Sequence, residues 1–216
     1  MTLALYAHPF SSYCWKVQIA LWEMGLPFDY RSLEDPENGA AFQQLAPMGK
    51  MPILVDDDEV LFETSIMIEH LQLRFPDTMR LIPADPQAAL EVRFLDRVSD
   101  NYLMSPMQAV VANALRDEAS RSSAAVDAAY AQLDRAYVWW NDHMDARTWA
   151  AGDFSLADCA AAPALFYADW VRPIPEPLSA LKAYRARLLA RPTVSRAVEE
   201  ARPYRPYFPL GAPDRD

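Results

Sequence analysis

The sequence predicts an α/β domain followed by an all-α domain. In the first third of the chain, short apolar runs alternate with segments of helical spacing, which is typical of strand–helix–strand units. After a proline-rich stretch at 76–86, the apolar residues recur at helical spacing. We therefore expect an α/β domain over residues 1–76, a linker over 77–86 and a helical domain over 87–216.

The α/β domain is expected to begin with a strand, a helix and a second strand. The apolar run at 3–7 predicts a buried strand, and the helical spacing at 13–24 predicts a helix that Gly25 ends. Residues 28–33 predict the second strand, which lies parallel to the first because a helical crossover joins parallel strands. A short helix is expected at 40–45.

A hairpin and a further helix complete this domain. The apolar runs Pro52–Val55 and Val60–Phe62 flank four acidic residues, a pattern that predicts a hairpin. We interpret the acidic residues as a solvated turn, because they lack the Gly and the terminal Glu of a calcium-binding loop. A helix is expected over 64–74, where apolar residues again have helical spacing.

The remainder of the chain predicts helices throughout. They are expected at 87–116, 122–144, 155–170, 178–189 and 193–201. Pro106 lies inside the first of them and predicts a kink there. Ser155 and Asp158 have the S-x-x-D spacing of a capping box and begin the third helix, which is strongly apolar. The tail is rich in Pro and aromatic residues and is expected to pack back on the body.

Composition excludes several classes of function. A net charge of −10 argues against a nucleic-acid partner, which requires clustered Lys and Arg, and we interpret the acidity as favouring solubility. No apolar run approaches the ~18 residues that span a bilayer, and no signal peptide is evident. Cys14 and Cys159 form no C-x-x-C pair, so we expect neither a disulfide framework nor a zinc site, and a reducing cytoplasm as the setting.

Known catalytic signatures are missing as well. The chain has no G-x-S-x-G, no P-loop and no G-x-G-x-x-G, and its three His are scattered. No metal site and no permanently bound cofactor are expected.

The start of the first helix carries the strongest functional signal. Ser11-Ser12-Tyr13-Cys14 has the spacing of a redox C-x-x-C motif whose first Cys is replaced by Ser11. Dithiol exchange is thereby lost, because the attacking thiolate is missing. A hydroxyl at a helix N-terminus can instead donate a hydrogen bond to the thiolate of a ligand. The alternative is that Ser11 or Ser12 only caps the helix.

Three segments together resemble a cytosolic glutathione transferase of the Ser type. They are His8–Leu21 (HPFSSYCWKVQIAL), Ala46–Leu54 (APMGKMPIL) and Leu61–Leu71 (LFETSIMIEHL). The capping box of the helical half is similar to that family too. The resemblance implies a thioredoxin-like N-terminal domain, an all-helical bundle as C-terminal domain, and a homodimer. It also implies glutathione as co-substrate and a small hydrophobic electrophile as partner.

Residue by residue, the resemblance implies a site for glutathione. Its implied binding residues are Ser11, Lys50, Met51, Pro52, Glu63 and Thr64. Ser11 matches the donor to the glutathione sulfur, with Ser12 ranked second and Tyr13 and Tyr6 behind them. Met51 would pair its backbone with the cysteinyl unit ahead of a cis-Pro52. Glu63 suits the α-ammonium group of the γ-glutamyl unit, and Thr64 at a helix start suits its α-carboxylate.

The electrophile is expected over the helical domain. Candidate pocket residues are Tyr102, Met104, Met107, Val111, Trp170 and Tyr207. We further expect Asp100 to reach the glutathione site of a neighbouring subunit.

Three alternatives to conjugation stay open. One is a zeta-like cis–trans isomerase, since Ser-Ser-x-x-Trp-Lys-Val is partly similar to that class, although Tyr13 stands where the class commonly has Cys. The second is a thiol reductase that uses Cys14. The third is a non-catalytic glutathione-binding module. The Glu63-Thr64 pair, in place of the family's usual Glu-Ser, is a mild departure.

Overall fold

A four-stranded mixed sheet forms the centre of the N-terminal half. The computed structural model describes residues 3–216. The strands lie in the order β2-β1-β3-β4, namely Asp29–Ser32, Leu3–Ala7, Ile53–Asp56 and Glu59–Leu61. β1 and β2 are parallel, whereas β3 is antiparallel to both β1 and β4. The structure therefore confirms the predicted parallel crossover and the hairpin.

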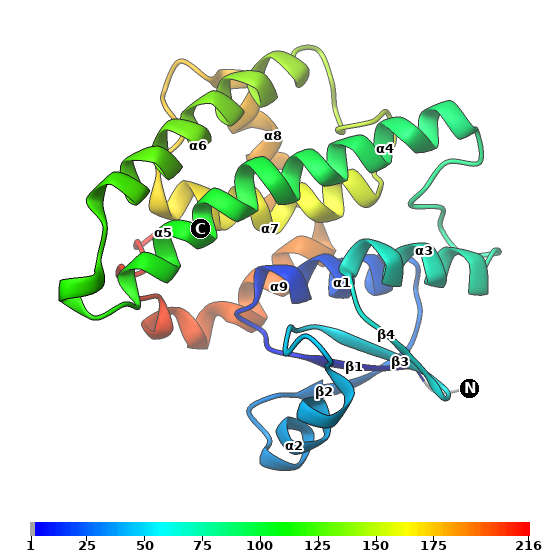
Figure 1. Ribbon diagram of the computed structural model, residues 1–216. Helices are drawn as coiled ribbons and strands as arrows, with labels where there is room; N and C mark the ends of the chain where they lie inside the picture. The colour runs from blue at the N-terminus through cyan, green and yellow to red at the C-terminus, as the bar shows by residue number, and fades with distance from the viewer. Residues whose placement is uncertain (1–2) are drawn as a thin grey trace.

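Helices cover both faces of this sheet. α1 (Ser12–Glu23) and α3 (Thr64–Arg74) lie on the face toward the helical half, and α2 (Pro36–Leu45) lies on the other (Figure 1). α2 is longer than the predicted 40–45. The carboxylate of Asp35 accepts a hydrogen bond from the Glu37 backbone N–H at 2.8 Å, and Pro36 suits the first helical position. This cap starts the helix one turn earlier.

The C-terminal half is a bundle of helices. They are α4 (Pro86–Val98), α5 (Ser105–Ala114), α6 (Ser123–His143), α7 (Leu156–Val171), α8 (Ser179–Leu189) and α9 (Pro192–Ala201). Every residue of α7 is buried, so this helix is the core of the bundle. The Asp158 carboxylate accepts from the Ser155 backbone N–H at 2.9 Å, which confirms the capping box. The predicted fold class, a thioredoxin-like α/β domain followed by a helical bundle, is confirmed.

A π-helical turn over Ser99–Met104 joins α4 to α5 in one continuous helical run (Figure 1). It lies directly before Pro106, where we predicted a kink. Proline has no N–H to donate, and its ring crowds the carbonyl four residues earlier. A π turn holds more residues than an α turn, so it rotates the side chains that follow it relative to a regular helix.

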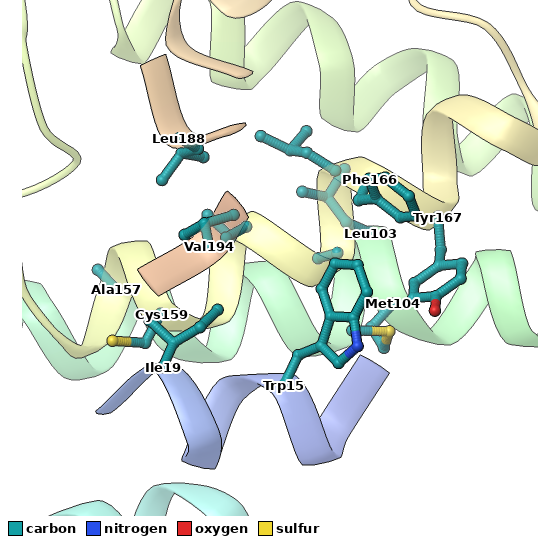
Figure 2. Packing of buried hydrophobic residues seen from close by; sticks show 14 of the residues in the cluster. Trp15, Ile19, Leu103, Met104, Ala157, Cys159, Phe166, Tyr167, Leu188 and Val194 are labelled. Carbon is teal, nitrogen blue, oxygen red and sulfur yellow. The ribbon is translucent and has the colours of Figure 1, made fainter. Parts of the chain in front are cut away.

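The two halves are packed together through α1 and α7. Trp15 is fully buried, and its ring lies 4.9 Å from Phe166 and 5.4 Å from Tyr167 between ring centroids (Figure 2). The Trp15 indole N–H donates to the Pro9 carbonyl at 2.6 Å. The Tyr167 hydroxyl donates to the Phe10 carbonyl at 2.9 Å. The loop before α1 is thus fixed by the helical half.

The C-terminal tail packs back on the body, as predicted. Phe208 is buried with its ring 5.1 Å from that of Trp170. Asp216 pairs with Arg202 at 2.9 Å and also with Arg205. Both cysteines are buried free thiols. Within residues 3–216, no helix is long and apolar enough to cross a membrane, and no cluster of three or more His, Cys, Asp or Glu side chains is suited to a metal ion.

Candidate functional site

A cleft of about 580 Å³ opens between the edge of the α/β half and the α4–α5 run. Four segments line it: the start of α1, the loop 47–53, the segment 62–64 and residues 97–108 of the helical run. All six residues implied to bind glutathione lie on this one surface, although they come from three separate stretches of sequence. They are Ser11, Lys50, Met51, Pro52, Glu63 and Thr64.

Ser11 is the N-cap of α1. It has extended backbone angles of φ −89° and ψ 121°, and its Oγ accepts a long hydrogen bond of 3.4 Å from the Cys14 backbone N–H. This contact uses the hydroxyl only as an acceptor, so its proton can be donated either to the Cys14 thiol or to a ligand. Ser12 is buried in the first turn, and neither Ser12 nor Tyr6 lines the cleft.

Tyr13 is the second hydroxyl in the cleft. Burial, together with the negative charge of Asp100, raises its pKa to about 12. The phenol therefore stays protonated at neutral pH and acts as a neutral hydrogen-bond donor.

Cys14 does not reach the cleft. Its side chain is fully buried, and burial raises the pKa of its thiol to about 11, although hydrogen bonds from Ser11 and His8 oppose this shift. A protonated thiol without access to solvent is a poor nucleophile. The geometry therefore disfavours a mixed disulfide at Cys14.

The loop 47–53 presents backbone groups to the cleft. Gly49 turns the chain with a positive φ of 59°, and the Met51–Pro52 peptide bond is cis, as the resemblance implied. The β1–β3 register ends at the pair Tyr6 and Ile53, so Met51 lies outside the ladder. Its backbone N–H and C=O therefore take no part in the β1–β3 ladder.

Glu63 and Thr64 form the start of α3. Glu63 has φ 70° and ψ 107°, a conformation that costs a side-chain-bearing residue about 1–3 kcal/mol and that is found mainly at functional sites. Thr64 is buried and begins the helix, whose first N–H groups have no partner within it. A carboxylate and a set of free N–H groups are therefore adjacent, which suits the two charges of an amino-acid end group.

A buried ionic network supports this end of the cleft, and the sequence did not predict it. Lys16 of α1 is 1% exposed, and its Nζ lies 2.5 Å from Asp96 and 2.9 Å from Asp100. Ser65 donates to Asp96 at 2.6 Å, and Arg97 donates to Ser65 at 2.7 Å and pairs with Asp100. The network thus ties α1, α3 and the α4–α5 run together.

Asp100 lines the cleft of its own chain, whereas we had expected it to reach a neighbouring site. Burial raises the pKa of Asp100 above its ordinary value, and the charge of Lys16 opposes this shift. The signal in the sequence that could have predicted this ionic network is Lys16, a charged residue on an otherwise apolar helix face.

Two family models match this chain. They are "Glutathione S-transferase, N-terminal domain" over residues 5–79 and "Glutathione S-transferase, C-terminal domain" over residues 123–187. The chain belongs to the glutathione S-transferase family. The predicted family is thereby confirmed.

Two solved structures and one curated protein are similar to this chain. The chain is similar to a glutathione S-transferase from Methylobacillus flagellatus with glutathione bound, with a TM-score of 0.81 and 26% identity, over 91% of this chain and 98% of that one. The chain is also similar to a glutathione S-transferase from Methylobacterium radiotolerans in complex with glutathione sulfonate, with a TM-score of 0.80 and 27% identity, over 92% of this chain and 95% of that one. A stringent starvation protein A homolog of Coxiella burnetii is 28% identical, over 76% of this chain and 75% of that protein.

None of the six residues that we predicted for a second-substrate pocket lines the cleft. Met104 and Met107 are 1% and 4% exposed in the core, and Trp170 is buried against Phe10. Val111 is half-buried, Tyr207 is exposed on the tail, and Tyr102 lines a separate hollow between α4 and α6. For the residues of the α4–α5 run, the π turn changes the helical register, because it rotates the side chains after residue 99 relative to a regular helix.

Proposed function

We propose that this protein is a glutathione transferase that holds the glutathione thiolate at Ser11 and directs it at a small electrophile. One observation carries the proposal: the N-cap of α1, the cis-proline loop and the start of α3 face the same cleft. Together they supply groups for the thiol, the cysteinyl and glycyl units and the γ-glutamyl end of the tripeptide.

Glutathione would lie along the cleft as an extended peptide. Its γ-glutamyl end fits the start of α3, with the α-carboxylate at the free N–H groups of Thr64 and the ammonium group at Glu63. The cysteinyl backbone pairs with Met51 in the manner of an added strand. Lys50 is exposed at the rim and suits the glycyl carboxylate.

Ser11 can supply the activation of the thiol. A thiol with a reference pKa of about 8.5 must reach roughly 6.5 to be mostly ionised at neutral pH, which corresponds to about 2.7 kcal/mol. One hydrogen bond to a charged group contributes about 1.5–3 kcal/mol, and the helix N-terminus adds about 0.3–1 kcal/mol. The hydroxyl of Ser11 and the N-terminus of α1 are therefore sufficient together.

Binding and turnover of glutathione test this proposal. We expect calorimetry to show tighter binding of glutathione than of S-methylglutathione, which has no thiol to ionise. We expect Thr64→Val, which removes one hydroxyl at constant volume, to weaken binding about tenfold. A matched Thr148→Val change, outside the cleft, leaves it unchanged. Glutathione that fails to bind, or that is never transferred to chlorodinitrobenzene or any other electrophile, would contradict the proposal.

A second candidate is a glutathione-binding module without turnover. The observation in its favour is that the curated relative from Coxiella burnetii is named a stringent starvation protein A homolog, not a transferase. Retention on a glutathione matrix with no product from electrophiles, peroxides or disulfides would favour this candidate. Isomerisation of a maleyl compound in place of conjugation would favour the zeta-like activity.

We also propose that the protein is a homodimer through α4 and α6. Large apolar side chains on these helices are exposed, with Phe94 at 54%, Val138 at 50% and Trp139 at 39%, around a hollow of about 430 Å³. Sedimentation should give a dimer for the wild type and a monomer for Trp139→Glu. The control Leu115→Glu changes an even more exposed apolar residue outside the hollow and should stay dimeric. A monomeric wild type would refute this assembly.

A further inference from the structure

The helical half contributes only polar residues to the cleft. They are Arg97, Asp100, Asn101 and Gln108, and Tyr13 stands opposite them on α1. Apolar lining residues such as Met48, Ile53 and Phe62 belong to the α/β half instead. A wholly apolar electrophile would therefore meet a polar wall on the side from which it must approach Ser11.

Two side chains of this wall have unused hydrogen-bonding capacity. Asn101 and Gln108 are exposed, and their side-chain amides make no hydrogen bond to any residue within 3–216. Arg97, by contrast, is already engaged by Asp96, Asp100 and Ser65. The groups left for a ligand are therefore two neutral amides and the phenol of Tyr13.

The charge balance disfavours an anionic second substrate. Lys50 and Arg97 among the lining residues offset Glu63 and Asp100, so their formal charges sum to zero. Bound glutathione in its thiolate form adds two net negative charges. A second anion in the same cleft would be repelled, whereas a neutral polar group would not.

We propose that the second substrate is a neutral α,β-unsaturated amide, whose amide group hydrogen-bonds to Asn101 and Gln108. This inference rests on the proposed transferase function and names its substrate class. An amide presents one acceptor and one donor, which matches the side-chain amides of Asn and Gln.

The reaction is an addition without a leaving group. The glutathione sulfur forms a bond to the β-carbon, and the π electron pair of the C=C bond moves onto the carbonyl oxygen as an enolate. Neutral donors at the wall, namely the Asn101 and Gln108 amides and the Tyr13 hydroxyl, stabilise this oxyanion. A proton from water then reaches the α-carbon, so that the thiol has added across the double bond and no oxidant or reductant is consumed.

A panel of electrophiles tests the substrate class. Rate enhancement, defined as kcat/KM divided by the rate constant for glutathione alone, is measured for N-methylacrylamide, acrylate and chlorodinitrobenzene. We expect N-methylacrylamide to give the largest enhancement. Asn101→Leu and Gln108→Leu should each lower the rate enhancement for N-methylacrylamide about tenfold, whereas the rate enhancement for chlorodinitrobenzene should be unchanged or higher. Gln87→Leu, the same change at an exposed site on α4 outside the cleft, should alter neither.

The outcomes separate this inference from the function on which it rests. A larger enhancement with chlorodinitrobenzene, or leucine variants that turn over the amide normally, overturns the substrate class and leaves the transferase function standing. Failure of glutathione to react with any member overturns the transferase function itself. Glutathione affinity measured by calorimetry must be equal in all variants, which shows that each one is folded with an intact first site.

Discussion

Ser11 has two separable roles, and replacing it in three ways tests both. Its Oγ caps α1 by accepting from the Cys14 N–H at 3.4 Å, and its O–H can donate to a thiolate. Ser11→Ala removes both roles. Ser11→Asp keeps an acceptor for the cap but has no proton to donate, and it adds a negative charge. Ser11→Thr keeps both, since extended backbone angles suit a β-branched residue.

The magnitudes differ enough to be told apart. Loss of a Ser N-cap costs about 0.5–2 kcal/mol, and the long bond here places the cost toward the lower end. Loss of a hydrogen bond to a thiolate costs about 1.5–3 kcal/mol, which lowers the rate about 10- to 150-fold. It should also raise the pKa of the bound thiol by about 1–2 units. We expect Ser11→Ala to lose a little stability and much activity.

Two measurements follow these roles independently. Denaturant unfolding reports the cap, and the pH dependence of kcat/KM, together with the ultraviolet absorbance of bound thiolate, reports the thiol. We expect Ser11→Asp to be as stable as the wild type and as inactive as Ser11→Ala. Ser11→Thr should resemble the wild type in both, and the control Ser12→Ala should leave the thiol pKa unchanged.

One result would refute this reasoning. If Ser11→Ala binds glutathione, turns over at the wild-type rate and leaves the thiol pKa in place, Ser11 is not the donor. Tyr13, the other hydroxyl in the cleft, would then be the donor, and Tyr13→Phe should show the losses expected here for Ser11. An active Ser11→Asp would refute the role of the hydroxyl proton just as directly.

Four further outcomes are expected. The free energy of unfolding should be about 1–2 kcal/mol higher for Glu63→Gly than for Glu63→Ala, because glycine adopts φ 70° without strain. Calorimetry should show weak glutathione binding in both variants. The free energy of unfolding should fall between pH 9 and 11, because folding raises the pKa of the Cys14 thiol from 9.0 to about 11. In this pH range the unfolded chain has lost the thiol proton and the folded chain has kept it. The fall should be smaller in Cys14→Ala. Lys16→Met should lower the free energy of unfolding, measured in denaturant, by up to about 3–5 kcal/mol, since it removes the buried cation of Asp96 and Asp100 and leaves them only the half-exposed Arg97. Asp158→Ala should cost more than the ~1 kcal/mol of a simple cap, because Tyr184 at 2.7 Å and the Ala150 N–H at 3.0 Å lose their acceptor; thermal unfolding measures it.

Features set by neighbouring residues were predictable from the sequence. The β3–β4 hairpin, α3 and the capping box at Ser155 and Asp158 depend on side chains within a few residues of one another. The predicted α2 was too short because it was based on apolar residues alone, whereas the helix begins at the N-cap residue Asp35. The residues that line the cleft from the α/β half could be predicted for another reason, since three local motifs each form one part of its wall.

Features that join distant elements were not predictable in this way. Lys16 pairs with Asp96 and Asp100, which lie 80 or more residues away on a helix whose rotation the sequence does not give. A Lys among apolar residues indicates that a buried charge needs acidic partners, but it does not indicate which residues these are. Its carboxylates become evident once α1 and the α4–α5 run lie side by side.

The polar wall of the cleft shows most clearly why helical spacing alone did not predict which side chains line it. Methionines at 104 and 107 and the polar residues Asn101 and Gln108 occupy the same few turns, and a regular helix leaves open which set faces Ser11. The π turn over Ser99–Met104 lies just before Pro106, which has no N–H to donate to a regular helical turn. With this turn in the helix, the methionines lie in the core and the amides line the cleft. The polarity of the site therefore follows from a backbone adjustment one turn away, and a Pro106→Ala variant that restores a regular helix should lose activity toward a polar electrophile while α1 and α3 still bind glutathione.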